Sequence, residues 1–147
     1  MSMNEVCIAS DPDSARALLE RHGGLDDCFV ERVTQDFRER WIEVVVDDLY
    51  RGKGTATSSP GMLLFRSIDY LLCRIPFVGG RVRVESCEIG EHQGKIKARF
   101  GFTTTEWLNE AEFSVVELVL VCGSIEVRRL DESIVSASAQ FPNGSPA

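Results

Sequence analysis

Two pairs of adjacent aspartates are the side chains of this sequence that most resemble a chemical site. Asp26 with Asp27, and Asp47 with Asp48, have the oxygen ligands that a divalent cation prefers and the groups that general acid and base catalysis needs. Neighbouring residues of a strand point to opposite faces, however, so each pair supplies one carboxylate to a face more readily than two. We interpret both pairs as solvated turns or strand ends, and we predict no metal site, no catalytic residue and no cofactor.

The nucleophiles of the chain also lack the neighbours that would activate them. A catalytic cysteine needs a nearby base, and the two histidines, His22 and His92, are expected at a helix end and at a hairpin tip. The cysteines are odd in number and form no C-x-x-C pair, which argues against a disulfide framework and a zinc site. We predict that all five are reduced and that they act as small buried apolar residues: Cys7, Cys28, Cys73, Cys87 and Cys122.

Basic residues alternate along two neighbouring segments. Arg81 and Arg83 share one strand face, and Lys95, Lys97 and Arg99 share another. Antiparallel pairing of the two strands would merge them into a basic patch that could bind an anion or an acidic partner. The other interpretation is an ordinary solvated strand face.

The net charge of −7 is unevenly distributed. Residues 11–50 contain eleven acids and five arginines, residues 51–99 nine bases and four acids, and residues 100–132 seven acids and two arginines. The overall field opposes nucleic-acid binding and attracts a cationic partner. The residues expected to contact that partner are exposed acids and one aromatic: Asp26, Asp27, Asp47, Asp48 and Trp107.

The elements that must position these residues are mainly strands. One helix is expected to begin at Ser10-Asp11-Pro12-Asp13, with an apolar stripe of small and leucine residues, and to end at His22 before two glycines. Residues 29–34 and 41–50 predict a hairpin, and so do residues 81–89 and 95–103. Residues 113–121 read as a strand buried on both faces, followed by a strand over 125–130. Residues 62–72 fit a strand or a helical face, and we favour the strand.

The fold class expected is therefore α+β and β-rich, with an N-terminal helix followed by a largely antiparallel sheet or sandwich of about six to eight strands. Residues 1–140 are predicted to form a single domain and residues 141–147 a disordered tail. Residues 51–60 and 77–80 are expected to be a loop and a turn, and residues 104–110 could hold a helical turn. No secretory signal and no membrane-spanning run is present, so we predict a cytoplasmic protein, monomeric or homodimeric.

The sequence contains Leu25-Asp26-Asp27-Cys28, a strand that ends in Asp48-Leu49, the stretch from Leu64 to Leu71, and the stretch from Leu118 to Val127. In these segments it resembles the immunity-protein-50 group, small β-rich immunity proteins of bacterial polymorphic toxin systems. Asp26 stands where the group has a histidine, and the group's Asn-rich motif is missing. The resemblance implies a non-enzymatic inhibitor that binds a partner toxin without a cofactor.

We therefore expect a protein-binding domain, in its specific form an immunity-type inhibitor of a basic toxin domain. One alternative is an acidic chaperone for secreted effectors, although such chaperones generally end in a helix. The other is a small α+β roll, an enzyme or ligand-binding protein, with Asp69, Tyr70 and Glu88 inside an interior pocket.

Overall fold

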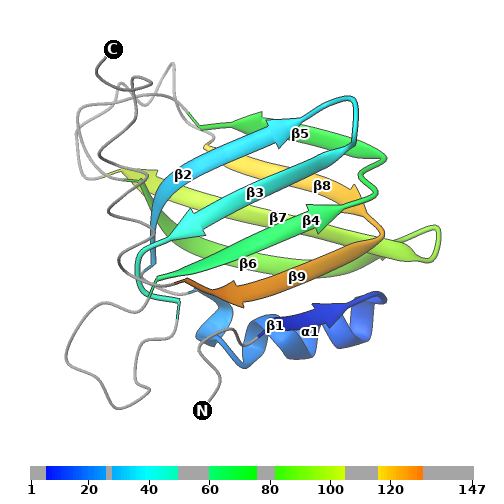
Figure 1. Cartoon of the computed structure of the whole chain (residues 1–147), viewed down its shortest axis with the longest axis horizontal. Coiled ribbons are helices and arrows are strands. Elements are labelled where there is room, and N and C mark those ends of the chain that lie inside the picture. Colours follow the sequence, from blue (N-terminus) through cyan, green and yellow to red (C-terminus); the bar gives the residue numbers. More distant parts are fainter. Residues whose placement is uncertain (1–5, 26–27, 50–59, 76–81, 105–115, 131–147) are drawn as a thin grey trace.

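Nine antiparallel strands form one sheet in the computed structural model, which describes residues 6–25, 28–49, 60–75, 82–104 and 116–130 (Figure 1). The order across the sheet is β1-β9-β4-β3-β2-β6-β7-β8-β5, so β1 and β5 are its edges. The strands are β1 (Val6–Ala9), β2 (Phe29–Asp36), β3 (Trp41–Val46), β4 (Gly61–Arg66), β5 (Tyr70–Arg74), β6 (Val82–His92), β7 (Lys95–Thr104), β8 (Glu117–Cys122) and β9 (Ser124–Arg129).

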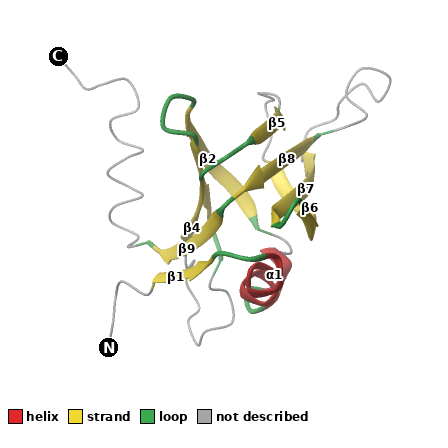
Figure 2. Cartoon of the chain, turned by 90° about the vertical axis from the view of Figure 1, so that its right-hand side faces the viewer, coloured by secondary structure: helices red, strands yellow, loops and turns green. Residues whose placement is uncertain are grey.

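The sheet curls so that its two halves face each other across the core (Figure 2). The halves are joined by only two residue pairs between β2 and β6, Phe29 with Arg83 and Val30 with Val82. Inside, the ring of Phe65 on β4 meets the ring of Phe100 on β7 edge to face, with centroids 5.7 Å apart. Strands distant in the sheet order therefore share one apolar interior.

The predicted helix is confirmed as α1 (Pro12–Glu20). Asp11 caps it, because its Oδ1 accepts a hydrogen bond of 2.8 Å from the Ser14 amide, and Pro12 occupies the first turn, where an amide hydrogen is not needed. Its buried side chains are Ala15, Leu18 and Leu19. The helix packs against β1, β6 and β7 and is followed by a short 3₁₀ turn (Gly23–Leu25). No helix in the described ranges is long and apolar enough to cross a membrane.

Alternation along β7 produces the facing that the sequence predicts. The buried side chains are Ile96, Ala98, Phe100 and Phe102, and the exposed ones between them are Lys95, Lys97 and Arg99. The β6–β7 turn is made by Gln93 and Gly94, both at positive φ (52° and 81°), as a two-residue hairpin turn requires. β6 continues to His92, beyond the predicted end at residue 89, so the turn contains two residues and is shorter than the gap between the predicted strands.

The expected count of six to eight strands is wrong, since the sheet contains nine. The strand missed is β1, because Val6–Ala9 is too short to show a period. The run over 62–72 is extended, as favoured, but it breaks at Ser67–Asp69 into β4 and β5. Residues 105–115 lie outside the described ranges; β8 begins at Glu117, and Glu117 and Val119 are only half-buried rather than buried on both faces. Residues 50–59, 76–81 and 131–147 also lie outside, so the loop, turn and tail predicted there are untested.

The interior leaves no room for a ligand where the two halves meet. A void lined by Phe65, Phe100, Leu118 and their neighbours has a volume of about 10 Å³, no more than one water molecule occupies. Asp69, Tyr70 and Glu88, the residues proposed for an interior pocket, are all exposed. The two larger hollows described below, of about 240 and 440 Å³, are lined mainly by exposed or half-buried residues.

One charged residue is nevertheless buried, on β9. Glu126 is 3% exposed, and each of its carboxylate oxygens contacts an arginine: Oε1 lies 3.3 Å from Arg66 Nη1, and Oε2 lies 2.6 Å from Arg128 Nη2. The two arginine side chains are about half exposed, so their charges remain hydrated while they neutralise the carboxylate. This cluster sits beside a small apolar group formed by Val45, Met62 and Leu64.

Candidate interaction site at the β2–β3 hairpin

The turn that joins β2 to β3 is held in place by hydrogen bonds at both ends. Within the turn, Asp36 Oδ1 accepts a bond of 2.8 Å from the Glu39 amide. Arg40 adopts a positive φ of 58°, and its carbonyl oxygen accepts a bond of 3.1 Å from the amide of Ile68 in the β4–β5 connection. The tip of the hairpin is thereby tied to the point where the chain passes from β4 to β5.

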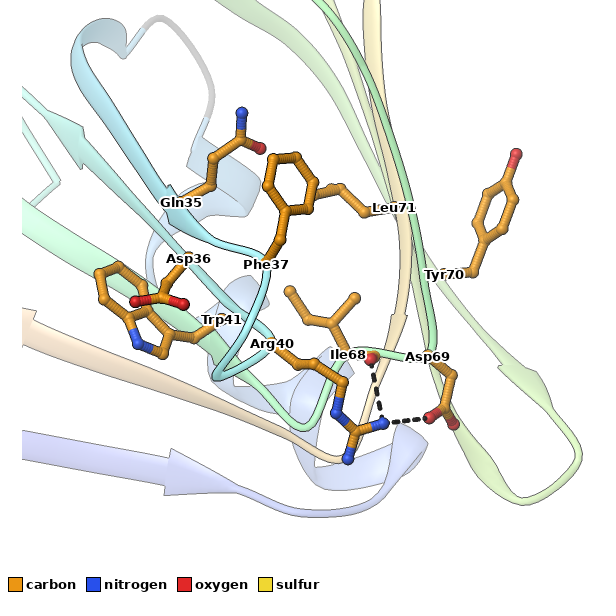
Figure 3. Close-up of a pocket in the computed structure, with 9 residues that line it drawn as sticks. All are labelled: Gln35, Asp36, Phe37, Arg40, Trp41, Ile68, Asp69, Tyr70 and Leu71. Carbon is orange, nitrogen blue, oxygen red and sulfur yellow. Dashed lines mark hydrogen bonds and ion pairs between the residues drawn. The ribbon is translucent and has the colours of Figure 1, made fainter.

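Asp69 joins this turn to the β6–β7 hairpin. Its Oδ1 lies 3.2 Å from Arg40 Nη1, and its Oδ2 accepts a hydrogen bond from the Lys95 ammonium (Figure 3 shows the arginine contact). Arg40 also reaches the Ile68 carbonyl, at 3.5 Å. The Lys95 hydrogen bond, supported by the charges of Lys95 and Arg40, holds the pKa of Asp69 below its usual range. The cluster is exposed, so it fixes geometry more than it adds stability.

A pocket of about 240 Å³ lies between the β2–β3 turn and the start of β5. The ring of Phe37 faces Leu71 across it, with Ile68 below (Figure 3). Phe37 is 78% exposed, the most exposed large apolar side chain among the described residues. The remaining lining residues are Gln35, Asp36, Arg40, Trp41, Asp69 and Tyr70.

A second hollow, of about 440 Å³, lies on the other side of β5. Tyr70, which is 52% exposed, points toward that side and away from Phe37 (Figure 3). The residues lining this hollow are Asp69, Tyr70, His92, Gln93, Lys95, Lys97, Val119 and Val121. The Asp69 cluster therefore stands between two surface depressions of different character.

The aspartates proposed as partner contacts are not part of this site. Asp47 follows β3 at the end opposite the turn, about 20 Å from Trp41 for six residues of strand. Its amide donates to the Phe29 carbonyl at 3.0 Å, and its Oδ1 accepts a bond of 2.9 Å from the Phe29 amide. Asp47 thus extends the hydrogen bonding between β2 and β3 at the end of the pair opposite the turn. Asp48 is the next residue and is half-buried. Asp26, Asp27 and Trp107 lie outside the described residues.

The basic residues form no continuous patch among the described positions. Arg83 is opposite Thr103, four residues along β7 from Arg99 and so about 13 Å away. Lys95 is paired with Asp69, and Arg99 contacts Glu117 at 3.0 Å. Lys97 has no ion-pair partner within the described ranges. Arg81 lies outside them.

The described cysteines are free thiols, as predicted. Burial raises the pKa of Cys87 and that of Cys122 to about 12, so neither is an activated nucleophile. Cys73, on the edge strand β5, is exposed, contrary to the expectation of burial. No group of three or more His, Cys, Asp or Glu side chains is placed to hold a metal ion in the described part.

Sequence reasoning missed Phe37 and Arg40, the two turn residues that define the site. The segment Gln35–Arg40 reads as a polar turn, and the one aromatic residue in the middle of it is the signal that could have indicated an exposed apolar side chain there. Asp69 and Tyr70 were singled out, but for an interior position that they do not occupy.

No family model, curated protein or solved structure matches this chain.

Proposed function

We propose that this chain is a non-enzymatic protein-binding domain that docks a partner protein on the β2–β3 turn, with Phe37 as the central anchor. The observation that carries the proposal is the exposed Phe37 ring at the rim of a pocket. Aromatic anchors that insert into a partner contribute a large share of binding free energy at protein interfaces. A pocket behind the anchor offers a place for a side chain of the partner in return.

The turn is prepared for binding because it is already fixed. Hydrogen bonds from the Glu39 and Ile68 amides, together with the Arg40–Asp69 ion pair, hold the segment that presents Phe37. A loop that is ordered before binding does not lose conformational entropy on association. This support favours a recognition role for Phe37 over an incidental surface position.

A basic partner is favoured by the net charge of −7, which attracts a cationic protein at long range. In this arrangement the acids, including Asp47 and Asp48, raise the association rate, and Phe37 holds the complex. The resemblance to immunity proteins gives the proposal its specific form, an inhibitor that covers a toxin domain.

The test compares three forms of the full chain as bait for proteins of the source organism. Phe37→Ser removes the anchor, and Ile8→Ser is the matched control, since Ile8 is also an exposed apolar side chain (61%) but lies on β1 at the far edge of the sheet. Mass spectrometry identifies any protein captured by the parent and the control but lost with Phe37→Ser. That protein is then purified, and its affinity is measured by titration calorimetry.

We expect Phe37→Ser to weaken binding at least about tenfold and Ile8→Ser to change it less than about twofold. The association rate should fall as salt rises, because screening at 0.1 M acts over about 10 Å. A captured partner whose affinity is the same for all three forms would rule out the turn as the docking site.

A further inference from the structure

The outer face of the sheet carries a trough that follows directly from strand register. Tyr70 on β5 is opposite Val121 on β8, which is opposite Lys97 on β7, which is opposite Gly90 on β6. Adjacent strands are about 4.8 Å apart, so Tyr70 and Lys97 rise roughly 10 Å from each other with the short Val121 side chain between them. Two long side chains beside a short one leave the hollow of about 440 Å³ described above.

Residues on either side of the Tyr70–Val121–Lys97 row form the rest of the trough. Val119 extends the apolar floor by one row, next to Arg99. At the other end, the Lys95–Asp69 ion pair crosses the trough, and the β6–β7 turn adds His92 and Gln93. The result is a depression with an apolar floor and a polar rim, of the size of known small-ligand sites, about 300–1,000 Å³.

The charge of the trough is set by one residue. Of the three bases that alternate along β7, the first is neutralised by Asp69 and the third by Glu117. Lys97, the middle one, faces the trough and has no ion pair within the described ranges. The Tyr70 hydroxyl and the His92 ring also have no hydrogen-bond partner there. Three polar groups able to donate hydrogen bonds therefore surround an apolar floor.

We propose that this trough binds a small carboxylate that carries a compact apolar or aromatic group. A single uncompensated ammonium matches a single negative charge, and Tyr70 and His92 can donate to the carboxylate oxygens. The valine floor and the Tyr70 ring receive the apolar body of the ligand. The site lies across β5 from Phe37 (Figure 3). It shares Asp69 and Tyr70 with the pocket beside Phe37, but neither Phe37 nor Leu71 lines it.

The experiment titrates the isotope-labelled full chain with 3-phenylpropionate and follows the methyl signals of Val119 and Val121 by NMR. Two further probes separate the contributions: 3-phenylpropanamide keeps the ring without the charge, and acetate keeps the charge without the ring. We expect the two valines to shift with 3-phenylpropionate at millimolar concentration or below. The amide and acetate should each bind at least about tenfold more weakly, since each lacks one of the two contacts.

Substitutions at Lys97 test the charge. Lys97→Met keeps most of the side-chain length and should weaken binding of 3-phenylpropionate at least about tenfold, whereas Lys97→Arg should retain it. Arg21→Met is the control, because it lowers the net charge equally at an exposed position at the end of α1. Lys97 is exposed, so its replacements should fold; Lys97→Gln is a second neutral variant.

Three results would overturn the proposal. They are valine methyl signals that do not move at 10-fold higher probe concentration than expected, equal binding of the acid and the amide, and an affinity that Lys97→Met and Lys97→Gln leave unchanged. Phe37→Ser should bind 3-phenylpropionate as the parent does, so loss of protein docking and loss of carboxylate binding are separate outcomes.

Discussion

The interior between the two halves of the sheet is apolar and buried, whereas the corner around Asp69 is exposed and carries charged residues. In the interior, Phe65 and Phe100 pack edge to face, and the neighbouring void is no larger than one water molecule. At the corner formed by Phe37, Arg40, Ile68 and Asp69, Phe37 is left exposed, and Arg40 and Asp69 form an ion pair. The interior supplies apolar burial, which is the main source of folding free energy, and the corner supplies a fixed shape. The comparison teaches that the same side chain, phenylalanine, is buried for stability in one region and left exposed in the other, where we propose that it serves recognition.

Replacing one phenylalanine in each region should give the largest contrast. Phe100 is 3% exposed, so Phe100→Ala should lower the free energy of unfolding by about 3–5 kcal/mol through lost burial and a residual cavity. Phe37→Ala should change it by less than about 0.5 kcal/mol, as surface substitutions generally do. Urea denaturation followed by circular dichroism measures both. Similar losses in the two variants would show that Phe37 is a core residue and would remove the basis of the docking proposal.

The sequence predicted the interior better than the corner. The alternation over Lys95–Phe102 and the cap at Asp11-Pro12 are local signals, and both β7 and α1 appear as expected. The strand β1 is four residues long and is defined by its pairing with β9, whose residues lie 116 to 122 positions away along the chain. No local sequence pattern contains that pairing. The corner depends on such contacts too.

Charge and turn residues show why the site could not be found in advance. Asp69 meets Arg40 and Lys95 only because the β4–β5 connection, the β2–β3 turn and the β6–β7 hairpin converge. Composition identified acidic and basic segments, but it could not indicate which bases would be neutralised. The distinction between Lys97 and its neighbours Lys95 and Arg99 is likewise a result of register and of ion pairing across strands.

Two glycines provide a second contrast between packed and open regions. A Cβ on Gly61 would lie 2.3 Å from Leu49 Cδ2 and 2.7 Å from Leu49 Cβ, whereas a Cβ on Gly90 would meet nothing within 4 Å. Gly61→Ala should therefore cost about 1–3 kcal/mol through overpacking, and Gly90→Ala should be neutral or stabilising by up to about 1 kcal/mol. Thermal melts compare the pair. A Gly61→Ala variant as stable as the parent would mean that Leu49 is not packed against β4.

The smallest effect is expected at the corner itself, and it should depend on pH. The Lys95 hydrogen bond lowers the pKa of Asp69 below its ordinary value of 3.8, so the folded state favours the ionised carboxylate. The stability gained is present above pH 3.8 and is lost as the pH falls through the lowered folded-state pKa. Asp69→Asn should therefore melt slightly below the parent at pH 7, and the two melting temperatures should converge as the pH falls below 3.8 and through the lowered pKa of Asp69. Glu85→Gln, at an exposed position on β6, controls for the change in net charge and should show no such convergence. If the gap in melting temperature between Asp69→Asn and the parent stayed constant as the pH falls, the carboxylate charge would not be what ties the β2–β3 turn to β7. The fixed shape of the corner would then have to come from two hydrogen bonds, from the Ile68 amide to the Arg40 carbonyl and from the Glu39 amide to Asp36 Oδ1.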